Sequence, residues 1–332
     1  MKVLTNLKKN TIILLLITIL ILYIVLKDDW INIINTLKTM DIKLIFLAFL
    51  SFFLSVSIKG YSNYLIINQK DKISLREAIK HNIIVQFFNG ITPFSTGGQP
   101  MEIYMITEHN ISLPKATNYS IQSFIFYQLA LVICGIFAVI YNFIFKIFPK
   151  VKYLKILVFL GFIINLLVAI ILLLIANSKK STNKLCNITI KICHKFKIKK
   201  KDSEIEEKFT DLYNGFRQLS KNKALTIIGI GLNIVSLLFL YLVPLFIVYS
   251  MGDFTSLNIA ETLTSSAYIF LVGAFIPIPG SSGGIEYGFT QFFGNFISKN
   301  KISAVLLIWR FITYYLAVAL GGIIFSLEKK VK

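Results

Sequence analysis

Residues 154–176 read LKILVFLGFIINLLVAIILLLIA, an apolar run in which the strongly polar side chains are Lys155 and Asn165. A helix rises about 1.5 Å per residue, so a run of this length crosses the ~30 Å hydrocarbon core of a bilayer. A helix that is apolar on every side is typical of a membrane span rather than of a small soluble domain. The stretch therefore predicts a transmembrane helix.

Similar runs recur in both directions along the chain, at 11–26, 43–58, 82–94, 118–145, 224–251, 262–279, 283–297 and 302–326. No small-residue cleavage site follows 11–26, so we interpret it as a retained span rather than a signal peptide. Two runs, 82–94 and 283–297, are shorter than the ~20 residues of a span and adjoin Pro and Gly clusters. We expect an all-α polytopic membrane protein, with about six full spans plus two re-entrant helical hairpins.

The composition supports this class. Apolar residues make up 55% and charged residues 15% of the 332 residues, against about 25% charged in soluble domains, and the mean hydropathy is +0.71. These values exclude a soluble globular enzyme, a disordered tail and a basic nucleic-acid-binding domain. The net charge of +19 is therefore interpreted as positive loops facing an anionic leaflet, and no nucleic acid is expected as a partner.

Lys and Arg predict which loops face the cytoplasm. The basic segments expected inside are the N-terminus, 59–81, 178–223 and the C-terminal EKKVK, and the acidic loops expected outside are 27–42 and 252–261. Segments 82–105 and 262–297 must then be re-entrant from opposite faces. The short loop 146–153 falls outside despite its lysines. We expect a multi-pass protein of the cell membrane with cytoplasmic N- and C-termini.

The halves 1–150 and 151–332 then have the same order of segments in opposite orientation. This predicts a single integral membrane domain built as an inverted 4+4 repeat, with 178–223 as a cytoplasmic basic loop inserted in the second half. PFSTGG at 93–98 aligns with PGSSGG at 279–284, and an acid follows each. Such irregular backbone at membrane depth needs protein or a wet cavity around it. Paired broken segments point to a transporter binding site, and the alternative is two loops that cap helix ends.

Single polar residues near these turns suggest a site. Arg310 lies inside the last apolar run, where a charge needs a partner or water. It would bind an anionic head group bidentately, pair structurally with Glu286, or extend to the outer surface. Asn89 would cap a helix or donate to a head group, and Gln99 also flanks the first turn. Glu102 would belong to the site or remain solvated.

The three cysteines are too few for a disulfide framework. Cys186 and Cys193 with His194 do not have a standard zinc spacing. The chain carries no Walker motif, no GxSxG and no HExxH. We therefore expect no cofactor, no metal, no catalytic residue and no ATP hydrolysis in this chain.

FNGITPFSTGGQPMEIY at 88–104 and PIPGSSGGIEYGF at 277–289 resemble the flippase-like membrane domain of lysylphosphatidylglycerol synthases. The resemblance covers nearly the whole chain and implies a helical domain with inverted halves that binds or moves lipid head groups. It places the implied site at Pro93, Gly97, Gly98, Gln99, Glu102, Pro279, Gly283, Gly284 and Glu286. Arg310 is added from membrane energetics, and Asn89 because it precedes Gly90 at the first turn.

The synthases that this domain resembles also carry a soluble domain that transfers lysine from lysyl-tRNA to phosphatidylglycerol. Few residues follow the last apolar run here, so we expect this chain to lack that chemistry. The first hypothesis is a lipid flippase whose partner is a phospholipid: phosphatidylglycerol, its lysyl ester or another lipid-linked head group. The alternatives are a phosphatidylglycerol lysyltransferase, or a component of it, and a small-solute transporter. A homo-oligomer is compatible with each.

Overall fold

The computed structural model describes residues 34–36, 38–149, 151–195, 201–273 and 276–331. Every regular element in these residues is a helix, which confirms the all-α fold class. The first expected span, 11–26, lies outside the described residues.

The first part of the chain contains α3 (Ile42–Ile67), α4 (Leu75–Ile91), η1 (Pro93–Ser95), α5 (Gly98–Thr107) and α6 (Leu113–Phe145). The second contains α7 (Lys152–Asn177), α8 (Lys179–Lys195), α9 (Asp202–Lys221), α10 (Lys223–Ser250), α11 (Ile259–Gly273), η2 (Pro279–Ser281), α12 (Gly284–Phe293), α13 (Lys299–Arg310), η3 (Phe311–Tyr315) and α14 (Leu316–Val331). The η1 and η2 segments are 3-10 turns, and η3 is a single π-helical turn between α13 and α14.

Five helices in the described part of the chain are long and apolar enough to cross a membrane: Ile42–Ile67, Leu113–Phe145, Tyr153–Ile171, Lys223–Ser250 and Lys299–Glu328. The last of these runs through α13, η3 and α14. The short apolar runs do not form spans of their own, because α4, α5, α11 and α12 have 17, 10, 15 and 10 residues.

Local polar side chains determine where several helices begin. Asp41 precedes α3, and its carboxylate accepts the Lys43 N–H at 2.8 Å. Ser74 and Glu77 form a capping box at the start of α4. These contacts satisfy backbone N–H groups that have no partner inside the helix.

The α4–η1–α5 segment is a helical hairpin. Near the turn the Gly98 N–H donates to Asn89 Oδ1 at 3.0 Å, and at the open end the His81 and His109 Nε2 atoms lie 3.3 Å apart. The α11–η2–α12 segment is a second hairpin, in which the Tyr268 and Phe292 rings stack with centroids 5.4 Å apart. Each segment therefore begins and ends at the same end of the bundle.

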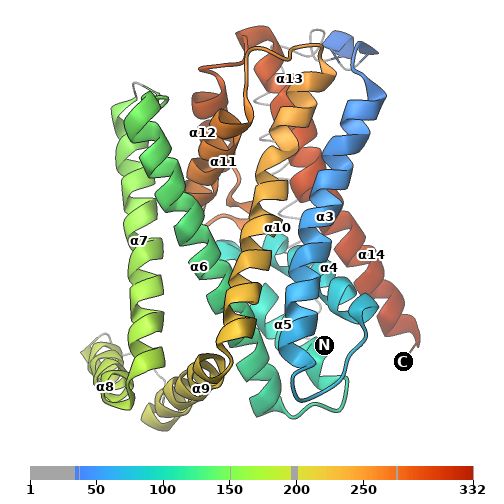
Figure 1. The fold of residues 1–332 in the computed structure, drawn as a ribbon. Coiled ribbons are helices and arrows are strands. Elements are labelled where there is room, and N and C mark those ends of the chain that lie inside the picture. The colour runs from blue at the N-terminus through green and yellow to red at the C-terminus, as the bar shows by residue number, and fades with distance from the viewer. Residues whose placement is uncertain (1–33, 37, 150, 196–200, 274–275, 332) are drawn as a thin grey trace.

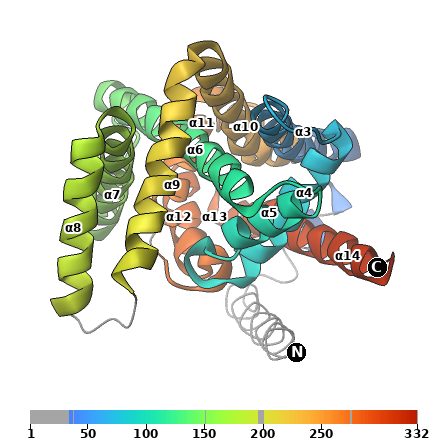
Figure 2. The ribbon, with the colours of Figure 1, turned by 90° about the horizontal axis from the view of Figure 1, so that it is seen from below.

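Helices α3 and α10 lie side by side (Figures 1 and 2). They run antiparallel, since the Asp41 N–H at the start of α3 donates to the Ser250 carbonyl at the end of α10, at 2.8 Å. Small side chains bring them close: Ser236 Oγ donates to the Ser55 carbonyl at 2.9 Å. In Figure 1 the α4–α5 hairpin occupies the lower half of the bundle and the α11–α12 hairpin the upper half.

Two expectations need correction. The basic segment 59–81 is expected as a loop, but α3 continues to Ile67, so Lys59 lies inside a candidate span. The 178–223 segment, expected as a basic loop, contains helices α8 and α9 (Figure 2). These two helices lie across the lower end of α6 and α7, as amphipathic helices at a membrane surface do.

Candidate functional site

The two turns share an unusual backbone. Thr92 and Ile278 are extended, and each is followed by a proline. The next two residues of each turn have positive φ: 52° and 53° at Phe94 and Ser95, and 63° and 52° at Gly280 and Ser281. Left-handed backbone is costly for residues other than glycine, so its repetition at equivalent positions is a structural likeness beyond the sequence pattern.

The turns diverge at their Gly-Gly pairs. Gly97 has φ −80°, whereas Gly283 has φ +87° and is exposed. A Cβ at Gly98 would lie 2.1 Å from Asn89 Oδ1, so a glycine is needed where Asn89 caps the start of α5. The Gly97 N–H is held by Thr92 Oγ1 at 2.8 Å. Of the two predicted roles of Asn89, the structure shows the cap.

The first turn presents a polar edge. Pro93, Ser95, Thr96 and Gln99 are exposed. In the second turn Pro279 and Gly284 are half-buried, and a Cβ at Gly284 would lie 2.0 Å from the Ile276 side chain.

Tyr314, in η3, joins the two turns. Its hydroxyl donates to the Gly90 carbonyl of the first hairpin at 3.0 Å. A Cβ at Gly280 of the second turn would lie 2.4 Å from the same ring. Turns η1 and η2 also contact each other directly. The two predicted turns, 186 positions apart in the sequence, therefore meet around one tyrosine.

Arg310 is buried beside the second turn, where an ion pair and hydrogen bonds hold its guanidinium. Its Nε lies 2.7 Å from Glu286 Oε1, an ion pair whose N–H is not aligned for a hydrogen bond. Its terminal nitrogen donates to the Gly280 carbonyl at 3.1 Å and approaches Ser282 Oγ at 3.4 Å. The guanidinium also lies 4.4 Å from the Tyr314 ring centroid. The partnership of Arg310 with Glu286 is confirmed.

Glu286 has a second role. Its Oε2 accepts the Gly283 N–H at 2.6 Å and so caps the start of α12. One carboxylate therefore holds both the buried cation and the backbone of the turn. Both side chains are at least nine-tenths buried.

Glu102 lies in a different environment. It is buried and faces α3 and α6, where Asn63 Nδ2 donates to Oε1 at 2.8 Å and Ser120 Oγ to Oε2 at 2.6 Å. Asn63 accepts in turn from Ser123 at 2.7 Å. Glu102 is thus neither solvated nor the counterpart of Glu286. The structure brings Glu286, Gly283 and Arg310 together and places Glu102 in a separate polar cluster.

The chain was then compared with known proteins. The model of the lysylphosphatidylglycerol synthase transmembrane region matches residues 11–321. The chain belongs to this family. It is also similar to a UPF0104 membrane protein of Archaeoglobus fulgidus, with 25% identity over 308 residues that cover 87% of this chain and 88% of that protein. Family membership and the apolar helices together make the chain a multi-pass membrane protein.

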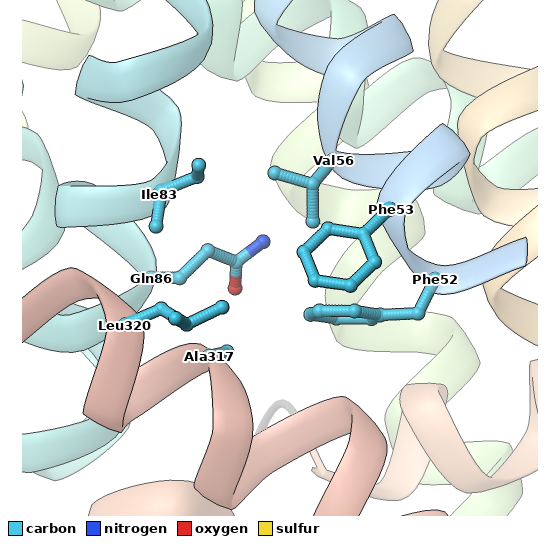
Figure 3. A pocket seen from close by; sticks show the side chains of 7 residues that line it. All are labelled: Phe52, Phe53, Val56, Ile83, Gln86, Ala317 and Leu320. Carbon is cyan, nitrogen blue, oxygen red and sulfur yellow. The ribbon is translucent and has the colours of Figure 1, made fainter. Parts of the chain in front are cut away.

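A pocket in this lysylphosphatidylglycerol synthase-type domain lies between α3, α4 and α14 (Figure 3). Its lining is apolar except for Gln86, whose amide points into it and makes no hydrogen bond to a described residue. The lining residues are Phe52, Phe53, Val56, Ile83, Gln86, Ala317 and Leu320. Gln128, in contrast, joins α6 to α7 by donating to Asn165 Oδ1 at 2.8 Å.

Three further residues, Tyr314, Thr92 and Lys59, stand out only in the structure. Tyr314 follows Arg310 by one turn, and that spacing was its only signal. Thr92 precedes the first turn, and nothing in the sequence around it indicates a special role. Lys59 was assigned to a loop. Within the described residues, no group of three His, Cys, Asp or Glu side chains is placed to hold a metal ion.

Proposed function

We propose that this protein translocates phospholipid head groups across the cell membrane, between the two hairpin turns. The observation that carries the proposal is the meeting of η1 and η2 around Tyr314, next to a buried Arg310–Glu286 pair. Irregular backbone of this kind at membrane depth is typical of transporter binding sites.

We also propose that the domain is an inverted repeat. The order α10, α11, η2, α12, α13 repeats the order α3, α4, η1, α5, α6, and the hairpins enter from opposite ends of the bundle in Figure 1. The lower end would be cytoplasmic, with the C-terminus and the basic helix α8 at that surface. Rocking of one half against the other would then expose the turns alternately to each side.

The second turn suggests how an anionic head group would bind. Glu286 already occupies the place of an anion, since its two oxygens face the Arg310 guanidinium and the Gly283 N–H. When Glu286 moves away, the Arg310 guanidinium and the Gly283 N–H lose the carboxylate that they share. A phosphate would offer oxygen acceptors for both groups. The Glu286 carboxylate would occupy the phosphate-binding position in the absence of lipid. It would leave that position when a phosphate binds.

The test is translocation in liposomes, using head-group-labelled phosphatidylglycerol and its lysyl ester. The informative variant is Arg310→Met with Glu286→Gln, because removing one partner alone leaves an uncompensated buried charge that costs about 3–5 kcal/mol, whereas removing both charges is often neutral. Lys43→Met, at the exposed start of α3, is the matched control. We expect the double variant to fold and to lose translocation, and the control to keep it.

The same preparation separates the rival functions. Lysine incorporation into lipid by the purified chain would favour the lysyltransferase. Ion or solute flux without lipid movement would favour a small-solute transporter. Either result, in the absence of lipid movement, would contradict the proposal.

A further inference from the structure

Lys59 is a cation within a candidate span. It lies on α3, facing α6, and its Nζ sits 4.4 Å from the centroid of the Tyr127 ring. The side chain is half-buried. It therefore points between helices rather than extending along α3 to the membrane surface, which is the usual way for a lysine to escape the lipid.

The ammonium group has no anionic partner in contact. Lys59 makes no hydrogen bond or ion pair with any residue that the structure describes, and its ammonium group lies over the face of the Tyr127 ring. Glu102 is an acid that acts on it electrostatically without forming an ion pair. Both oxygens of Glu102 already accept hydrogen bonds, from Asn63 and Ser120.

The hydroxyl of Tyr127 is also available to form a hydrogen bond. Its hydroxyl makes no hydrogen bond within the described part of the chain, whereas those of Tyr119, Tyr268 and Tyr314 all donate. An ammonium and a phenol hydroxyl on facing helices are thus both free to donate. A cation inside a span is costly unless an acceptor or water satisfies it.

The partners of Lys59 differ from those of Arg310, which also lies within a candidate span. Arg310 is neutralised by Glu286 and further held by Gly280, Ser282 and Tyr314. Lys59 has one aromatic ring and an acid with which it makes no ion pair. Of these two intramembrane cations, Lys59 is the one that lacks an anion.

We propose that Lys59 and Tyr127 form an anion-binding site for the phosphate group of an anionic phospholipid. Lysine is a compact point charge that suits phosphate, and the phenol supplies a second donor. Eight residues separate Lys59 from the end of α3, a depth of about 12 Å at 1.5 Å per residue. The site is therefore near the lower end of the bundle, apart from the Arg310 site of the second hairpin.

This inference deepens the proposed function, because it names the ligand and adds a second station on its path. The negative charge of Glu102 predicts opposite effects of two substitutions on ligand affinity. The carboxylate repels an anion at Lys59, so neutralising Glu102 strengthens binding while neutralising Lys59 weakens it. A purely structural role of Lys59 would predict no such opposite effects on ligand affinity.

The test is equilibrium binding of water-soluble dioctanoyl phosphatidylglycerol to the full chain in detergent micelles. Dioctanoyl phosphatidylcholine tests for the net negative charge, and glycerol phosphate distinguishes a soluble phosphate ligand from a lipid. The variants are Lys59→Met, Lys59→Arg and Glu102→Gln, and Lys43→Met is the control on the exposed start of α3.

A charge-assisted hydrogen bond corresponds to a change in affinity of about tenfold or more. We expect Lys59→Met to weaken phosphatidylglycerol binding by about that factor, Lys59→Arg to retain most of it, Glu102→Gln to strengthen it, and Lys43→Met to leave it unchanged. Binding of glycerol phosphate alone with the same Lys59 dependence would reassign the site to a soluble ligand. Equal binding by wild type and Lys59→Met, or equal binding of phosphatidylcholine, would overturn the inference.

If Lys59→Met fails to fold, as judged by gel filtration and circular dichroism, Glu102→Gln still decides, because unchanged or weaker binding of phosphatidylglycerol by that variant would overturn the inference. The two proposals also fail separately. Binding that depends on Lys59 in a wild-type protein that moves no lipid would refute translocation and keep this site. Translocation by a protein without Lys59-dependent binding would refute this site and keep the translocation proposal.

Discussion

Gly280→Ala tests whether the contact between the turns depends on close approach. A Cβ at this position would lie 2.4 Å from the Tyr314 Cε2 and Cζ atoms, well inside contact distance, and φ is +63°. Overpacking costs about 1–3 kcal/mol, and left-handed backbone in a residue with a Cβ costs about 1–2 kcal/mol. We therefore expect a loss of about 2–5 kcal/mol in the free energy of unfolding.

Two other glycines separate these contributions. Gly283 has φ +87° and ψ −52° but no atom within 4 Å of a Cβ, so Gly283→Ala carries a conformational cost alone, about 1–3 kcal/mol for a sparsely populated backbone conformation. Gly231, inside α10, has open space and ordinary helical backbone. Its replacement by Ala should stabilise the protein by up to about 1 kcal/mol.

The assay is unfolding of the purified protein by titration with sodium dodecyl sulfate, followed by circular dichroism. The predicted order of stability is Gly231→Ala, then Gly283→Ala, then Gly280→Ala. If Gly280→Ala were as stable as Gly283→Ala, the close packing of Tyr314 on the second turn would be refuted.

Two further predictions concern other contacts. Tyr314→Phe removes the hydrogen bond to the Gly90 carbonyl and should lower the free energy of unfolding by about 1 kcal/mol, measured in the same titration; an unchanged value would show that this bond does not join the hairpins. Asp71, in the connection between α3 and α4, accepts from Tyr119 at 2.6 Å and Lys115 at 2.9 Å, and these contacts lower its pKa. Its stabilising effect is therefore complete above the ordinary pKa of about 3.9 and lost as the pH falls through the lower folded value. Asp71→Asn should flatten the dependence of stability on acidic pH, and an identical acid profile would contradict this.

Periodicity and length predicted the helical class and the positions of both broken segments, because Pro and Gly-Gly interrupt apolar runs too short to span. The Arg310–Glu286 pair was also predictable, since a buried charge needs an opposite charge and the second half offers one close to its turn. The repeated positive φ at Phe94 and Gly280 could not be predicted, because a phenylalanine gives no sign of left-handed backbone.

The remaining features depend on tertiary contacts. Tyr314 contacts Gly90 across 224 positions, and no local pattern encodes such a distance. A charge usually ends an apolar run, so the sequence predicts a loop boundary at Lys59. In the structure α6 supplies an aromatic ring, and the Lys59 ammonium lies over it. The two acids that follow the turns looked equivalent, yet Glu286 caps its own helix and Glu102 binds α3 and α6.

The central claim is that lipid head groups pass between η1 and η2. Its most direct measurement is photo-crosslinking from Phe94→benzoylphenylalanine, since Phe94 belongs to the first turn and its side chain is 56% exposed. The control is Phe143→benzoylphenylalanine near the end of α6, where the side chain is 83% exposed. Mass spectrometry of the adducts from liposomes containing phosphatidylglycerol would locate each crosslink on the lipid. We predict adducts at the head group or glycerol from position 94 and at the acyl chains from position 143. Adducts from position 94 on acyl chains alone, or none at all, would contradict the account.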